Sequence, residues 1–181
     1  MKAIQTAISD LLIIEPKVFG DDRGFFFESF NRRRFAELVG RDLDFVQDNH
    51  SRSVKSVLRG LHYQIQHPQG KLVRVTQGKV LDIAVDIRKS SRTFGKHVAL
   101  ELSAENKRMF WIPEGFAHGF VVLSDSAEFL YKTTDYWFPE HERCIRWDDP
   151  TLAIDWGLQT SPSLSSKDKQ GKWLRDAELF S

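Results

Sequence analysis

The amino-acid sequence predicts an all-β protein built as a β-sandwich or barrel, and three observations support this fold class. Apolar and polar residues alternate with a period of two along several segments, as they do in strands with one buried face. Turn-forming residues separate these segments at short intervals. Only two stretches have a helical pattern. Many short strands with little helix are typical of sandwiches and barrels.

The two predicted helices are short. The stretch NRRRFAELVG begins at Asn31, which is a good N-cap residue, and ends at Gly40, which can adopt the left-handed conformation that stops a helix. The stretch SSKDKQG predicts a second helix that opens at Ser165 or Ser166. We expect both helices at the periphery of the strands.

The strands are predicted from the alternation itself. Residues 79–88 and 96–103 each predict one strand, and residues 120–138 predict two strands around a turn at 124–126. The polar segment 159–166 contains a proline, so we expect it to wrap the surface.

Length and composition bound the class of protein. A chain of 181 residues with 41% hydrophobic residues fits one domain, over 1–181, with a full core. The 26 basic and 25 acidic residues give a net charge of +1, which favours neither nucleic acid nor a membrane as partner.

Cys144 is the only cysteine, so we expect no internal disulfide and a reducing compartment. The apolar run Leu11–Ile14 is too short for a signal peptide or a membrane span. We therefore expect a soluble, cytoplasmic protein.

Two motifs raise the question of a metal site. The sequence PEGFAHGF, which contains His118, resembles the second signature of the cupin superfamily. In metal-binding cupins the first signature supplies two histidines and a glutamate as ligands. Here His62 matches the first histidine, but Gln64 and Lys71 occupy the positions of the second histidine and the glutamate. A charged ammonium cannot ligate a metal, and glutamine is a poor ligand for a transition metal. We therefore predict no metal, and assign no role to His67.

A histidine beside a fixed cation suits another chemistry. His62 can remove a proton next to a carbonyl, and Lys71 can stabilise the enolate oxygen that forms. A lone histidine in a strand is more often a hydrogen-bonded core residue. Here Arg59, Gln64 and Lys71 lie nearby in the sequence and favour a functional site.

Three further stretches allow either a structural or a functional interpretation. FGDDRGFFFESF can be an edge strand packed on a neighbour, or a stacking platform for a planar base. In FLYKTTDYWF, Tyr131 shares a face with Trp137, although a strand tyrosine usually serves packing. LSSKDKQG places Lys167 and Asp168 on the predicted short helix, where charges are usually solvated.

As an ordered set these segments closely resemble the dTDP-4-dehydrorhamnose 3,5-epimerases, which are metal-free cupins of deoxysugar nucleotide synthesis. The matching segments run from residue 19 to residue 168 and are FGDDRGFFFESF, FVQDNHSRS, VLRGLHYQ, PQGKLVRVTQGKVLDIAVDIR, WIPEGFAHGF, YKTTDYW and LSSKD. The resemblance implies a cupin-type jelly-roll barrel (a double-stranded β-helix) with short peripheral helices. It also implies an isomerase that inverts C-3 and C-5 of dTDP-4-dehydro-6-deoxy-D-glucose to give dTDP-4-dehydro-L-rhamnose, with no cofactor.

The resemblance also implies residue roles. His62 matches the base, Asp168 the carboxylate that orients it, Tyr131 the acid on the opposite face of the sugar, and Lys71 the enolate-stabilising cation. Arg59 and His118 match residues near the diphosphate and the sugar. Further substrate contacts match Arg23, Glu28, Gln47, Asp48, Asn49, Glu142 and Lys167, with Phe19, Phe26 and Trp137 near the base and deoxyribose. A homodimer that shares site residues between subunits is implied as well.

The residue types suit this chemistry. Both stereocentres are α to the C-4 ketone, so each proton is acidified and no redox step is needed. Histidine, with a pKa near ~6.5, is largely neutral at pH 7, and tyrosine, with a pKa near ~10, keeps its proton. Three alternatives remain open: an epimerase that inverts only one centre, a metal-dependent cupin enzyme, and a non-catalytic nucleotide-sugar binding module.

Overall fold

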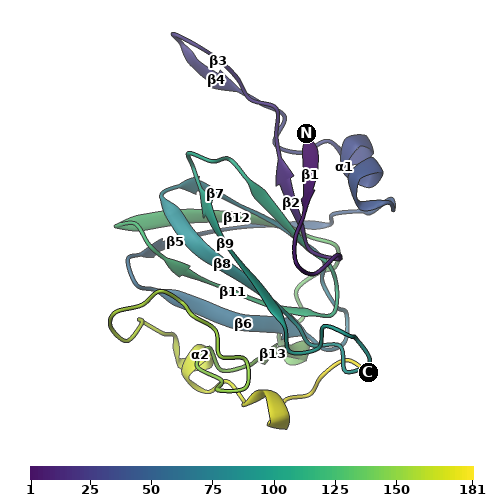
Figure 1. The fold of residues 1–181 in the computed structure, drawn as a ribbon, viewed down its shortest axis with the longest axis vertical. Coiled ribbons are helices and arrows are strands. Elements are labelled where there is room, and N and C mark those ends of the chain that lie inside the picture. The colour runs from purple at the N-terminus through teal and green to yellow at the C-terminus, as the bar shows by residue number, and fades with distance from the viewer.

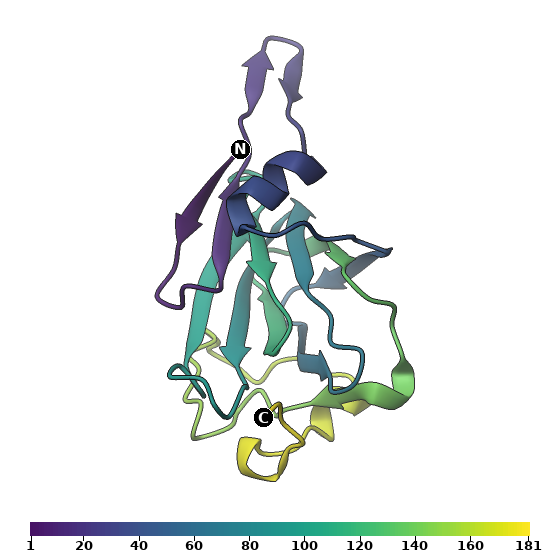
Figure 2. The same cartoon turned by 90° about the vertical axis from the view of Figure 1, so that its right-hand side faces the viewer.

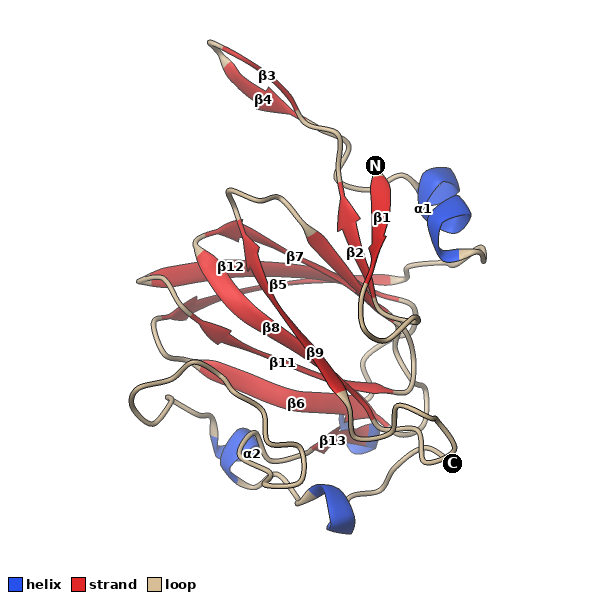
Figure 3. Ribbon diagram, viewed as in Figure 1, coloured by secondary structure: helices blue, strands red, loops and turns tan.

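Strands make up most of the ordered elements of the chain. The computed structural model describes all residues from 1 to 181, and helices lie only at the edges of the strands (Figure 1; Figure 3). The strands are β1 (Lys2–Gln5), β2 (Leu12–Glu15), β3 (Phe19–Asp21), β4 (Gly24–Phe26), β5 (Gln47–Val54), β6 (Leu58–Gln64), β7 (Lys71–Gln77), β8 (Lys79–Asp86), β9 (His97–Ser103), β10 (Met109–Ile112), β11 (Phe116–Val122), β12 (Ser126–Thr133) and β13 (Glu142–Cys144). The α-helices are α1 (Arg32–Val39) and α2 (Ser166–Lys169), and the 3-10 turns are η1 (Pro139–His141) and η2 (Leu174–Asp176).

Two antiparallel sheets face each other. One has six strands in the order β1-β2-β10-β7-β12-β5, and the other has five in the order β13-β6-β11-β8-β9. Each sheet keeps two free edges, so the pair forms an open jelly roll rather than a closed barrel. This arrangement confirms the predicted all-β jelly roll with short peripheral helices.

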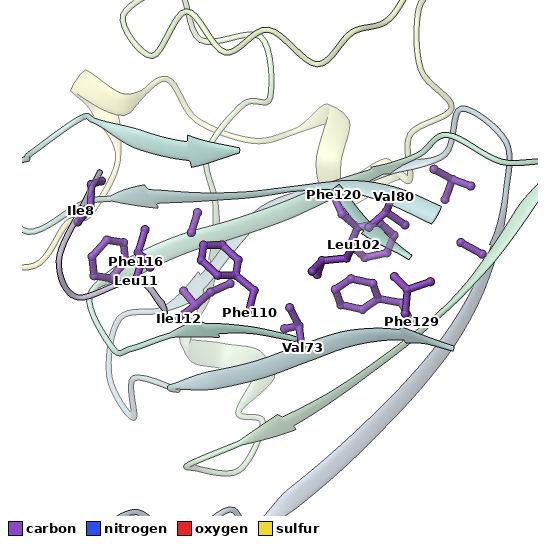
Figure 4. Close-up of a cluster of buried hydrophobic side chains, with 14 residues drawn as sticks. Ile8, Leu11, Val73, Val80, Leu102, Phe110, Ile112, Phe116, Phe120 and Phe129 are labelled. Atoms are coloured by element: carbon purple, nitrogen blue, oxygen red, sulfur yellow. The ribbon is translucent and has the colours of Figure 1, made fainter. Parts of the chain in front are cut away.

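The main core lies between the two sheets. Figure 4 shows its apolar side chains pointing into the space between the strands. Phe129 of the six-stranded sheet stacks on Phe120 of the five-stranded sheet, with ring centroids 4.2 Å apart. Phe110 is fully buried in the same cluster. The inward-facing half of each alternating strand therefore supplies this core.

A second core covers the outer face of the five-stranded sheet. Ile83 and Val85 of β8 pack there against Leu152, Trp156 and Leu174 from the C-terminal segment. That segment is tied to the body by parallel bridges, including one between residues 57 and 163. Strand β8 is therefore buried on both faces, and the polar segment 159–166 follows the surface as predicted.

Both predicted helices are present, with the predicted caps. The side chain of Asn31 accepts a hydrogen bond from the Arg34 N–H, and Gly40 ends α1 with a φ of 76°. Ser165 is the N-cap of α2, and Asp168 completes a capping box with it. The end of one strand was predicted wrongly: β12 stops at Thr133, and residues 134–138 form a loop.

The β3–β4 hairpin projects away from the body in both views (Figure 1; Figure 2). The exposed fractions of Phe19, Phe25 and Phe26 are 53%, 65% and 69%. These aromatic side chains are therefore not part of a core within the chain, and they offer an apolar surface outside it. No helix has the length and apolar character needed to span a membrane.

The core between the sheets makes a stability prediction. We expect Phe110→Ala to lower the free energy of unfolding by about 3–5 kcal/mol, because a fully buried ring is replaced by a cavity. Lys96→Ala, at an exposed position, should change it by less than about 0.5 kcal/mol. Denaturant titrations of both variants measure the difference, and equal midpoints would refute the assignment of Phe110 to the core.

Candidate active site

A cavity of about 500 Å³ opens between the two sheets. Strands of both sheets, helix α2 and the loop after β12 contribute to its lining. The predicted site residues that line it are Gln47, Asn49, Arg59, His62, Lys71, His118, Tyr131, Trp137, Glu142, Lys167 and Asp168. Residues that lie far apart in the sequence are thus brought to one place.

An irregularity in β6 sets which side chains face this cavity. Arg59 and His62 are three residues apart, so a regular strand would send them to opposite faces. The pairing of β6 with β11 shifts between these two positions, and both side chains line the cavity. Gly60 lies at the shift with a φ of 114°, and a Cβ there would come within 2.6 Å of the carbonyl oxygen of His118. Only glycine fits this position.

His62 and Asp168 form a close pair, in which Asp168 is buried and His62 is partly exposed. His62 Nε2 lies 2.7 Å from Asp168 Oδ1, although the imidazole N–H is not aligned with that oxygen. The carboxylate also accepts hydrogen bonds from the Gly60 N–H at 3.1 Å and from the Ser165 hydroxyl at 2.6 Å. Burial raises the pKa of Asp168, but the close imidazole of His62 and the hydrogen bonds from Ser165 and Gly60 outweigh burial and lower it to about 2. Asp168 is therefore an ionised group that can orient and stabilise a protonated imidazole.

Tyr131 and Lys71 reach the cavity from the opposite sheet. Tyr131 lies on β12 and Lys71 on β7, whereas His62 lies on β6. Burial, assisted by the negative charge of Glu142, raises the pKa of Tyr131, so its phenol is a proton donor at neutral pH. Burial lowers the pKa of Lys71 to about 8, and the carboxylates of Glu142 and Asp82 oppose this shift. The cavity thus has a histidine on one wall, and a tyrosine and a lysine on the other.

A second histidine–aspartate pair lies beside the first. His118 is the register partner of His62 on β11, and its Nε2 lies 3.0 Å and 3.1 Å from the two carboxylate oxygens of Asp82. Both side chains are buried. The alternation of apolar and polar residues predicts that Asp82 lies on one face of a strand. No sequence motif assigns Asp82 to the site.

Some predicted site residues lie outside the cavity. Phe19, Arg23 and Phe26 lie on the projecting hairpin, where Arg23 pairs with Asp21. The Asp48 carboxylate pairs with Lys132 at 2.9 Å, away from the cavity. Glu28 accepts a hydrogen bond from Asn31. Their predicted contacts with substrate stay predictions.

Comparison with known proteins gives the family. A profile described as dTDP-4-dehydrorhamnose 3,5-epimerase matches residues 5–176. A protein of that description from Pseudomonas aeruginosa is 66% identical over 180 residues, which cover 99% of each chain. The chain belongs to the dTDP-4-dehydrorhamnose 3,5-epimerase family.

Two solved structures in this group are instructive. The dTDP-6-deoxy-D-glucose-3,5-epimerase of Legionella pneumophila, in complex with dTDP-4-keto-L-rhamnose, is 58% identical, with a TM-score of 0.96 over 98% of this chain and 94% of that one. A 3'-monoepimerase of Streptomyces bikiniensis, in complex with dTDP-quinovose, is 30% identical, with a TM-score of 0.90 over 97% and 88% of the two chains. Two epimerase activities therefore occur on the fold of this family.

Gln64 has a role in this epimerase-family chain that sequence reasoning missed. Its buried side-chain amide donates to the carbonyls of His67 at 2.7 Å and Tyr136 at 3.1 Å, and it accepts from the Phe138 N–H at 2.7 Å. These bonds hold the loop that carries Trp137 against the end of β6 and the loop that follows it. Gln64 is therefore committed to the backbone, and it is not free to be a metal ligand where cupins place one.

Cys144 is a second residue that sequence reasoning did not place. It is the register partner of His62 on β13, and Asp168 lies close to both. No sequence signal links Cys144 to the site, because the contact arises from the pairing of β13 with β6.

The bonds of Gln64 predict the order of its loop. In Gln64→Glu a carboxylate faces two carbonyls and cannot donate, so the loop at 134–138 should open more often. Hydrogen–deuterium exchange of this segment should speed up roughly 5–150-fold, the equivalent of about 1–3 kcal/mol. Gln66→Glu makes the same change at an exposed position and should leave exchange unaltered. Equal protection in both variants would show that Gln64 does not hold the loop.

Proposed function

We propose that this protein inverts C-3 and C-5 of dTDP-4-dehydro-6-deoxy-D-glucose to give dTDP-4-dehydro-L-rhamnose. The observation that carries the proposal is the placement of His62, with Asp168, opposite Tyr131 and Lys71 across one cavity. The descriptions of the related proteins support the same substrate and product.

Proton removal is the first step of the proposed mechanism. Neutral His62 takes the proton from the carbon α to the C-4 ketone, and the electron pair of that C–H bond moves toward the ketone oxygen. The ionised Asp168 stabilises the imidazolium that results. An enolate forms, and its oxygen carries the negative charge.

Lys71 stabilises this enolate in the proposal. Its ammonium is the cation on the wall opposite His62, and the negative charge it meets exists only after the proton has left. A group that acts on charge in the transition state lowers the barrier more than it strengthens substrate binding.

Tyr131 returns a proton in the proposal. Inversion requires that the new proton arrive from the face opposite the base, and the phenol lies on the opposing sheet with a raised pKa. Both stereocentres flank the same ketone, so the same four groups can serve C-3 and C-5 in turn. Asp168, His62, Lys71 and Tyr131 are the catalytic residues in this proposal.

Substrate binding is proposed for the other polar and aromatic groups. Arg59, Lys167 and His118 offer positive or donor groups to a diphosphate and a sugar. Around them we assign Gln47, Asn49, Glu142 and Trp137 from the cavity, and Arg23, Glu28, Asp48, Phe19 and Phe26 from outside it.

A homodimer is part of the proposal. The exposed aromatic side chains of the β3–β4 hairpin would complete the nucleotide end of the site of a partner subunit. A cytoplasmic location fits the free thiol of Cys144. No metal is assigned, because Gln64 is committed to the backbone and Lys71 is a cation.

Solvent exchange tests the assignment of base and acid. In heavy water, His62→Ala should abolish deuterium incorporation at C-3 and C-5, since no enolate forms without the base. Tyr131→Phe should retain exchange but lose most inversion, because the base can return a deuteron to the original face. Asp168→Asn should fall between wild type and the histidine variant. NMR of the sugar nucleotide reads both quantities, and a Tyr131→Phe variant that epimerises at the wild-type rate would exclude Tyr131 as the acid.

The pKa of Lys71 predicts the alkaline limit of activity. The ammonium is charged below its pKa of about 8, so kcat/KM should fall as the pH rises through about 8. The Tyr131 phenol has a raised pKa and titrates above this range. Lys71→Met should lower kcat about 10²–10³-fold with a much smaller change in KM. Lys79→Met, an exposed lysine of β8, is the matched control, and a pure KM effect at Lys71 would make it a binding residue.

Inversion of a single centre is the second candidate, because a 3'-monoepimerase shares this fold at 30% identity. The 66% identity to a protein described as a 3,5-epimerase favours double inversion. The configuration at C-3 and C-5 of the product, read by NMR, distinguishes the two activities.

A further inference from the structure

Three donor atoms of different chemistry converge beside the proposed base. Strand β13 pairs with β6 so that Cys144 lies directly across from His62, and α2 brings Asp168 to the same point. The sulfur of Cys144, a ring nitrogen of His62 and a carboxylate oxygen of Asp168 all lie within 4.8 Å of one another. This set does not include the cupin ligand positions at Gln64, Lys71 and His118.

Two of these donor atoms lack a well-aligned partner. His62 Nε2 is buried and makes no aligned hydrogen bond, although it lies 2.7 Å from Asp168 Oδ1. The sulfur of Cys144 has only a long contact of 3.5 Å with the carbonyl of Ile145. A cation that bound here would have to displace the close His62–Asp168 contact, but it would break no aligned hydrogen bond to either atom.

The local charge favours a cation. Asp168 is ionised, and Glu142 adds a second carboxylate nearby, which is paired with the Lys167 ammonium. Burial, with the charges of Asp168 and Glu142, raises the pKa of the Cys144 thiol to about 12, while Lys167 opposes the shift. The thiol is therefore protonated in the absence of a cation, and a bound cation must take the place of that proton.

The donor set selects the kind of cation. Thiolate, imidazole and carboxylate together suit borderline or soft ions such as Zn²⁺ and Cd²⁺, and they suit Mg²⁺ and Ca²⁺ poorly. Ligand atoms of a tetrahedral Zn²⁺ site lie roughly 3.4–3.6 Å apart. The His62–Asp168 pair would open slightly, and Cys144 would move inward.

We propose that Cys144, His62 and Asp168 form an inhibitory site for Zn²⁺ and similar thiophilic divalent cations. Binding releases the thiol proton of Cys144 to solvent. The neutral imidazole coordinates through Nε2 and keeps its proton on Nδ1, and a carboxylate oxygen of Asp168 and one water complete the tetrahedron. The ion binds Nε2, the nitrogen of His62 that faces Asp168. The carboxylate then binds the ion and no longer pairs with His62. This site goes beyond the proposed epimerisation, which needs no metal.

A spectroscopic test reads the site without any assay of activity. The full-length protein, freed of metal by a chelator, is titrated with Co²⁺, which replaces Zn²⁺ in such sites. Because Cys144 is the only cysteine, a thiolate-to-cobalt charge-transfer band in the near ultraviolet reports this residue alone. The wild-type protein should show the band and lose it on addition of Zn²⁺. Cys144→Ser and Cys144→Ala should not show it, and a wild-type protein without the band would overturn the proposal.

Inhibition is the second readout. The chelator-treated wild type should be active, should be inhibited by Zn²⁺ or Cd²⁺ but not by Mg²⁺, and should recover on renewed chelation. Loss of a residue that only supports a metal ligand costs about 10–100-fold in affinity. Loss of the thiolate ligand itself should cost more, so it should raise the inhibitory Zn²⁺ concentration at least about 100-fold. Unchanged thermal unfolding of Cys144→Ser shows that it folds, and Cys144→Ala is the second variant if it does not. A serine variant inhibited at the wild-type Zn²⁺ concentration would contradict the site. Failure of epimerisation with a positive cobalt band would contradict only the proposed function.

Discussion

The carboxylate of Asp168 is the group on which the site depends. It is almost completely buried. From helix α2 it contacts the irregular part of β6 at Gly60 and the imidazole of His62. Burying a charge is costly unless hydrogen bonds compensate for it, and here the Gly60 N–H and the Ser165 hydroxyl do so. The same carboxylate closes the capping box of α2, so the helix cannot form with its native cap unless the carboxylate beside His62 is in place. Local helix formation and the position of the His62–Asp168 pair are therefore one constraint.

The two-sheet architecture separates the groups that the proposed mechanism uses for inversion. His62 lies on the five-stranded sheet, whereas Tyr131 and Lys71 lie on the six-stranded sheet. Because the sheets are held apart by a packed aromatic core that includes Phe120 and Phe129, a substrate between them meets the two sets of groups from opposite sides. A single sheet would present all of its inward side chains from one side. The jelly roll thus supplies the facial separation, and the side chains supply the proton chemistry.

Sequence reasoning succeeded where the cause is local and failed where the cause is a strand pairing. The caps Asn31 and Ser165 follow from the residues themselves and were predicted, as was the strand predicted over 79–88 and observed over 79–86. The cavity residues were predicted from the resemblance, since periodicity alone would have sent Arg59 and His62 to opposite faces. The roles of Asp82, Gln64 and Cys144 arise from contacts with other strands or loops, and no pattern within their own segments encodes them. The end of β12 was also missed, because its loop is held by the distant Gln64.

With Lys71 as its cation, the cavity has a positive charge that depends on pH. A divalent ion keeps its charge over the whole physiological range of pH, whereas the Lys71 ammonium is lost above its pKa of about 8. Glu142 and Asp82 keep that pKa from falling further, so these two carboxylates maintain the cation although neither is a proton donor or acceptor in the proposed steps. Glu142 has a second effect, because it also lies near Cys144 together with Asp168. Glu142 therefore acts on both groups, because it supports the charge of Lys71 and adds negative charge beside the carboxylate, imidazole and thiol of the proposed cation site.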